Sequence, residues 1–235
     1  LQASVASILL VLLPLAFVRG RGPSGDRRGA WAPLLYFLSL GVGFIALEIA
    51  TMQRLALFLG HPIYSLTVTL SAFLLFPGLG SLLSARIAPD PRRAARLGVG
   101  AILLAVALHA LLLDGLLHAA LGAPFPARVA LALLLLAPLG LSLGIPFPSG
   151  LRILEAEAPA LLPWAIGVNG TASVLGSVAT LLVSMSFGFR VSGLVAAGIY
   201  LLGTAPLLRR ARTTASSPDR APSASPARST EFHGG

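Results

Sequence analysis

The chain contains no cysteine and no lysine, and only eight of its 235 residues are acidic. Without cysteine it has no disulfide framework, no thiolate nucleophile and no cysteine-based metal site. The carboxylates are too few to supply both an acid–base active site and the solvated surface of a soluble enzyme. The glycine-rich dinucleotide loop, the P-loop, the nucleophile elbow and the H-E-x-x-H pattern are also missing. We therefore expect no catalytic residue, no cofactor and no metal site in this chain.

Apolar residues, by contrast, dominate the sequence. They make up 56% of the chain against 11% charged residues, and the mean hydropathy is +0.88. A soluble domain cannot bury that much apolar surface, so the composition predicts an all-α, polytopic transmembrane helix bundle. A membrane-spanning helix needs about 20 apolar residues. The expected spans are roughly Leu1–Val18, Pro33–Leu59, Pro62–Ile87, Leu97–Leu121, Ala127–Ile145, Leu161–Phe187 and Val191–Leu208.

The placement of the basic residues predicts how the bundle is oriented. All seventeen are arginine, and most of them lie in alternate connections and in the C-terminal tail. Basic residues gather on the cytoplasmic side of a membrane, so we expect the N-terminus outside and the C-terminus in the cytoplasm. The net charge of +9 is accompanied by no basic helix and no aromatic platform. It therefore indicates the lipid bilayer as a partner and not nucleic acid.

The chain is expected to divide into a helix bundle over residues 1–208 and a tail over residues 209–235. The tail is rich in Ser, Pro, Ala and Arg, cannot bury a core, and is predicted to be disordered. The chain begins with Leu1, and the first apolar run has its arginines after it, which is the reverse of a secretory signal peptide. We expect this first span to be truncated and the chain to be a piece of a larger protein.

Polar side chains inside the second expected span mark the first candidate binding site. They are Glu48, Gln53 and Arg54. A charged side chain at bilayer depth is costly and usually faces a bundle interior with a partner. Glu48 is either a proton or cation site or a buried anchor for packing, and both readings stay open. Arg54 is six residues on, about 240° around the helix, so it either snorkels to the outer interface or meets a partner from another span.

The sixth expected span, Leu161–Phe187, carries small residues at helical spacing. Asn169, Ser173 and Ser177 form one row, and Ala172, Gly176, Thr180 and Ser184 form another. Such rows allow helix backbones to approach closely. We therefore expect this span to be central in the bundle, with Asn169 as the partner of Glu48. Glycines in the second and third spans suggest further close crossings: Gly41, Gly43, Gly78 and Gly80.

Histidines supply the remaining candidates. His61 stands in the tight turn Gly60-His61-Pro62 between two spans, where it either hydrogen-bonds locally, which is the preferred reading, or lines an outer vestibule. His109, Asp114 and His118 are spaced too loosely for a metal site, so a polar helix end is favoured.

Two prolines interrupt the chain after the fifth expected span. Pro146 and Pro148 remove backbone donors and are expected to end that helix. The segment Leu151–Ala158 is then expected to form a short helix on the cytoplasmic surface, with Arg152 and Glu155 as a candidate pair three residues apart.

Several ordered stretches resemble the C-terminal membrane region of the large bacterial membrane-fused spermidine synthase-like proteins, which are similar to polyamine aminopropyltransferases. These are GVGFIALEIATMQRLALFLGHPIYSLTVTL, GLGSLLSARI, GIPFPSGLRIL and PWAIGVNGTASVLGSVATLLVSMSFGF. The resemblance implies membrane helices joined to a soluble Rossmann-like domain that uses an S-adenosyl donor and an amine. The glycine-rich loop and paired aspartates of that domain have no counterpart in this chain.

Three functions follow from these observations. The leading one is the integral membrane domain of a spermidine synthase-like protein in a bacterial cytoplasmic membrane, serving as an anchor and as a path for a polyamine or related amine. A buried Glu48 would suit such a cation. The second is a small secondary transporter or half-transporter in which Glu48 couples to protons or cations. The third is a purely structural membrane bundle.

Overall fold

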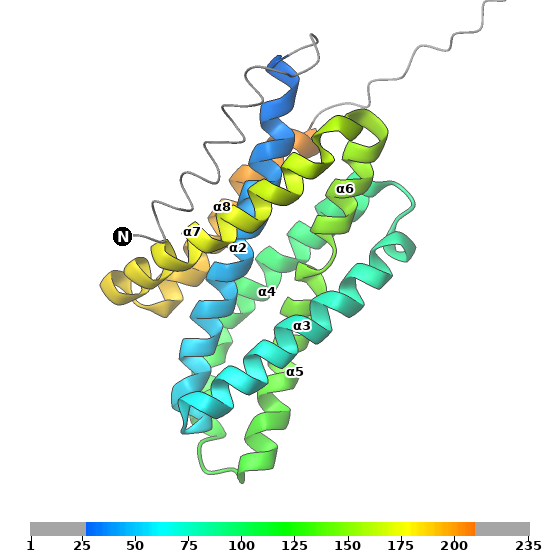
Figure 1. The fold of residues 1–235 in the computed structure, drawn as a ribbon. Helices are drawn as coiled ribbons and strands as arrows, with labels where there is room; N and C mark the ends of the chain where they lie inside the picture. The colour runs from blue at the N-terminus through cyan, green and yellow to red at the C-terminus, as the bar shows by residue number, and fades with distance from the viewer. Residues whose placement is uncertain (1–26, 210–235) are drawn as a thin grey trace, which may run out of the picture.

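A computed structural model describes residues 27–209. Over this range the chain is helical: seven α-helices and one short 3-10 helix follow each other. They are α2 (Arg27–Leu59), α3 (Pro62–Ile87), α4 (Pro91–Ala119), α5 (Phe125–Leu143), α6 (Pro146–Glu157), η1 (Pro159–Leu161), α7 (Leu162–Phe187) and α8 (Phe189–Arg209). Figure 1 shows the long helices side by side in one bundle, with α7 and α8 crossing α2 obliquely.

Six helical stretches within residues 27–209 are long and apolar enough to cross a membrane. The expected spans at 33–59, 62–87, 97–121, 127–145, 161–187 and 191–208 each correspond to one of them. The expected first span, Leu1–Val18, and the tail from residue 210 lie outside the described residues. The chain is thus an all-α, polytopic membrane protein, while its orientation in the membrane stays a prediction.

Helix α2 is the centre of the bundle. It packs against α7, α8 and α3, and 56% of its most apolar stretch is buried, against 22% for that of α7. The expectation that the 161–187 span is central is therefore wrong. The buried residues of α7 are the row of Ala172, Gly176, Thr180 and Ser184 together with Ala165 and Thr171. All of them are small, whereas the larger side chains of α7 point outward.

The turn between α2 and α3 forms as the sequence predicts. Gly60 has a φ of +80°, a left-handed conformation that glycine adopts without steric cost. His61 is the N-cap of α3, and its Nδ1 accepts a hydrogen bond from the Ile63 amide at 3.3 Å. Pro62 then occupies the first helical position, where no N–H is needed. The local role expected for His61 is confirmed.

The chain between α5 and α6 breaks at Gly144 and Ile145, so the expected end of the fifth helix is confirmed, but the next helix begins earlier than the expected Leu151. Pro146 and Pro148 do not lie in a loop, because they form the first turn of α6, where a missing N–H breaks no helical hydrogen bond. Nor does α6 lie apart from the bundle: it contacts α4 and α2, and the Tyr36 hydroxyl donates to the Pro146 carbonyl at 2.7 Å. The 125–157 stretch is thus one interrupted element.

Glycines set the closest helix crossings. A Cβ added at Gly80 of α3 would lie 2.0 Å from the Leu141 carbonyl oxygen of α5. One added at Gly41 of α2 would lie 2.2 Å from the Asn169 carbonyl oxygen of α7, and one at Gly43 would lie 2.4 Å from the Tyr200 ring of α8. These three expected crossings are confirmed. Gly78 has nothing within 4 Å of an added Cβ, so the prediction for that glycine is wrong.

Candidate functional site

The C-terminal half of α2 presents Thr51 and Arg54 towards α4 and α8. The Arg54 guanidinium forms an ion pair with the Asp114 carboxylate of α4. The exposed fractions are 13% for the Arg54 side chain and 59% for that of Asp114, so the cation is the buried partner. Of the two roles expected for Arg54, the structure therefore supports the one with a partner on another span.

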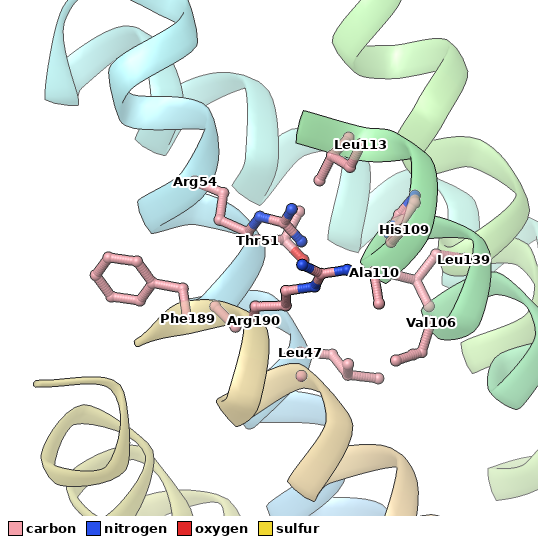
Figure 2. A pocket seen from close by; sticks show the side chains of 12 residues that line it. Leu47, Thr51, Arg54, Val106, His109, Ala110, Leu113, Leu139, Phe189 and Arg190 are labelled. Carbon is pink, nitrogen blue, oxygen red and sulfur yellow. The ribbon is translucent and has the colours of Figure 1, made fainter. Parts of the chain in front are cut away.

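A small cavity lies beside this ion pair. Its volume is about 20 Å³, and Figure 2 shows the side chains around it. Residues from α2, α4, α5 and α8 line it: Leu47, Ala50, Thr51, Arg54, Val106, His109, Ala110, Leu113, Leu139, Phe189, Arg190 and Gly193. The lining is apolar except for Thr51, His109 and two arginines, and it contains no carboxylate.

The polar groups of the cavity are donors. In Figure 2 the guanidinium groups of Arg54 and Arg190 both point to the space beside Thr51. Thr51 is only 7% exposed, and neither its hydroxyl nor the Arg190 guanidinium has a hydrogen-bond partner among residues 27–209. His109 Nε2 lies 2.9 Å from the Leu135 carbonyl, which can only accept, so this nitrogen carries the hydrogen.

The start of α8 adds a further positive element to this cavity. Phe189, Arg190 and Gly193, all in the first turns of α8, belong to the lining. The first amides of a helix have no acceptor within it, and the helix dipole places partial positive charge there. Gly188 precedes them with a φ of +84°, which lets the chain reverse directly from α7 into α8.

Glu48 lies one turn before Thr51 on α2 and is half-buried. No hydrogen bond joins it to Asn169. The main chain of Asn169 instead packs against Gly41, seven residues earlier on α2 and so about 10 Å away along the axis. Glu48 and Asn169 as binding residues, and Gln53, which is half-buried on α2, stay predictions.

Two further groups of polar residues that the sequence singled out do not form a binding site or an ion pair with each other. The Asp114 carboxylate pairs with Arg54, and His118 Nδ1 contacts the Asp114 backbone carbonyl at 2.9 Å. In the described part of the chain, no three His, Asp or Glu side chains gather as a metal site would require. Arg152 forms no ion pair with Glu155. The carboxylate of α6 that forms an ion pair is that of Glu157, and its partner is Arg92 of α4.

Arginines bind the ends of other helices, which the sequence did not indicate. Arg92 of α4 holds both oxygens of Glu157, at 2.5 and 2.6 Å, and donates to the Leu207 carbonyl of α8 at 2.7 Å. Arg96 donates to the Leu208 carbonyl. Arg128 donates to the Phe58 carbonyl of α2 at 2.9 Å. These arginines donate to carbonyls at helix ends, which receive no hydrogen bond from within their own helix.

Sequence reasoning therefore found Arg54 but missed Thr51, His109 and Arg190 as its neighbours. One signal was present: Arg190 is a charge directly at the start of an apolar span. Whether Arg190 lies near Arg54 depends on the angle at which α8 crosses α2, and no spacing in the sequence encodes that angle.

The fold and the site define a polytopic helical membrane protein with a small cationic cavity between α2, α4, α5 and α8. The chain matches no protein-family model, no curated protein and no solved structure.

Proposed function

We propose that this chain is the membrane-embedded anchoring domain of a spermidine synthase-like protein. The stretches that carry the resemblance support it, and they include several residues at which helices touch. They include Gly41 and Gly43 on α2, Gly80 on α3, the break before α6 and the buried row of α7. A likeness of general hydrophobicity alone would not favour the residues at which helices touch.

The coding sequence upstream of Leu1 tests the anchoring proposal. A soluble domain with a strand, a glycine-rich turn, a helix and paired aspartates supports it. Expression of that whole protein, followed by membrane fractionation with and without residues 27–209, then measures anchoring. Upstream sequence that encodes only further membrane spans contradicts the proposal and favours a transporter.

A second function, passage of a cationic amine or coupling to protons, is carried by one observation. Glu48 is a half-buried carboxylate on the central helix, without a hydrogen-bond or ion-pair partner among residues 27–209. A carboxylate inside a membrane bundle is by default a candidate for ion or proton binding. The cavity itself offers no path for an amine, because it is small and its two guanidinium groups repel a cation.

Transport by purified protein in proteoliposomes tests this second function. Glu48→Gln keeps the size of the side chain and removes its charge, and Glu155→Gln on the exposed surface of α6 is the matched control. If Glu48 binds the transported cation, uptake of labelled spermidine falls at least tenfold in Glu48→Gln and is unchanged in the control. Equal uptake in all three proteins, with equal stability, contradicts any role of Glu48 in transport.

A further inference from the structure

The cavity beside Arg54 carries more positive than negative charge. Arg54 and Arg190 contribute two guanidinium groups, and Asp114 is the single carboxylate that contacts either of them. Asp114 pairs with Arg54 from outside the lining, whereas Arg190 has no ion-pair partner among residues 27–209. Thr51 and the Arg54 side chain are largely shielded from water, whereas the Arg190 side chain is exposed. Two guanidinium groups placed around one small space favour the entry of an anion.

The neutral groups around the cavity point to the same kind of ligand. Thr51 is 7% exposed as a residue, and its hydroxyl lacks a hydrogen-bond partner in the described part of the chain and faces the two arginines. The first turn of α8 adds main-chain amides and the positive end of a helix dipole. Two charged donors, one hydroxyl and a helix start thus converge from α2 and α8 on one space.

The size of the space restricts the ligand further. A cavity needs about 10–15 Å³ to hold a water molecule, and this one offers about 20 Å³. That is room for one particle of the size of water and too little for a nucleotide, a polyamine or a whole lipid headgroup. The surrounding leucine, valine and alanine side chains provide no acceptor for a cation.

We propose that Arg54, Arg190 and Thr51 form a binding site for a single small inorganic anion of chloride size. Arg54 and Arg190 supply the charge, and Thr51 supplies a hydrogen bond. The bound anion joins α8 to α2, because it neutralises Arg190 at the place where the α7–α8 hairpin crosses the central helix. This site is independent of the anchoring and transport functions proposed above.

Thermal unfolding of the purified protein in detergent tests the proposal. Sodium chloride replaces sodium gluconate at constant ionic strength, and the unfolding midpoint is followed as chloride rises. A ligand that binds only the folded state raises this midpoint, and the stabilisation grows with the logarithm of its concentration once that concentration exceeds Kd. We expect this logarithmic rise with chloride and with bromide, whereas gluconate is too large to enter.

Variants assign the effect to the cavity. Arg190→Gln breaks no contact seen among residues 27–209, so the protein should fold. The chloride Kd fitted from its midpoints should be at least tenfold higher. Arg209→Gln removes the same charge at the other end of α8 and should leave the response unchanged. Thr51→Val removes the hydroxyl and should weaken the chloride response, whereas Thr51→Ser keeps the hydroxyl and should leave the response intact.

Several results would overturn the proposal. One is an equal midpoint in chloride and gluconate for the wild-type protein. Another is an equal loss of the chloride response in Arg190→Gln and Arg209→Gln, which would show general charge screening. A third is an absent chloride response combined with stabilisation by phosphatidylglycerol that requires Arg190, which would identify a lipid phosphate as the ligand instead.

Discussion

Arg54 of α2 and Asp114 of α4 form an ion pair whose two members differ sharply in exposure: 13% of the arginine side chain is exposed, against 59% of the aspartate. They are sixty residues apart in the chain and join the central helix to α4. The buried member determines the cost of breaking the pair, because a buried charge left without a partner is more costly than an exposed one.

The two ways of breaking this ion pair should therefore differ in how much they lower the free energy of unfolding. Asp114→Asn leaves the Arg54 guanidinium buried without its counter-charge, and we expect it to lower the free energy of unfolding by about 2 kcal/mol. Arg54→Gln leaves only an exposed carboxylate, with an expected cost of about 1 kcal/mol or less. Reversible unfolding in mixed detergent micelles measures both. An Arg54→Gln variant that is the less stable of the two would contradict this explanation.

The contact between Gly80 of α3 and the Leu141 carbonyl of α5 leaves no space for a side chain. Gly80→Ala places a methyl group against rigid backbone, so we expect the free energy of unfolding to fall by about 3 kcal/mol. Gly78→Ala on the same helix is the matched control, because nothing lies within 4 Å of its added Cβ. It should raise stability by about 0.5 kcal/mol through helix propensity. Similar losses in both variants would show that α3 and α5 do not approach as described.

Arg92 connects three helices through Glu157 and the Leu207 carbonyl. It is 5% exposed, and Arg92→Gln leaves Glu157 and the end of α8 without their donor. The expected loss of unfolding free energy is about 3 kcal/mol. The neighbouring exposed residue gives the control, since Arg93→Gln should change stability by about 0.5 kcal/mol at most. Limited proteolysis after Arg209 should also become faster in Arg92→Gln alone; equal rates would count against the role of Arg92 in holding α8.

The positions of the helices could be predicted from the sequence, because the length of an apolar run and a turn such as Gly60-His61-Pro62 are local properties. The positions of Gly41, Gly43 and Gly80 likewise predicted real crossings, since a missing side chain is the local requirement for close approach. Gly78 shows the limit of this rule: it lies on the side of α3 that meets no helix, and the sequence contains no signal that separates it from Gly80.

The candidate site was predictable only in part, for a different reason. Glu48 and Arg54 stand out within an apolar run, whereas the convergence of Thr51 and Arg190 depends on the angle at which α8 crosses α2. The end of α5 before the prolines was predicted, but the next helix begins at Pro146 and not at Leu151, because Pro146 is compatible both with the end of one helix and with the first turn of the next. In the structure Pro146 lies in the first turn of α6, and its carbonyl accepts a hydrogen bond from the Tyr36 hydroxyl.

The central position of α2 has a consequence for the order of synthesis. Its principal partners, α7 and α8, leave the ribosome more than a hundred residues later, and α4, which neutralises Arg54, also follows it. During this interval α2 must reside in the membrane before Arg54 meets Asp114, and an unpaired arginine at mid-depth costs about 3 kcal/mol. The insertion machinery or a chaperone must therefore shelter this helix, and a chain truncated before α7 should be degraded.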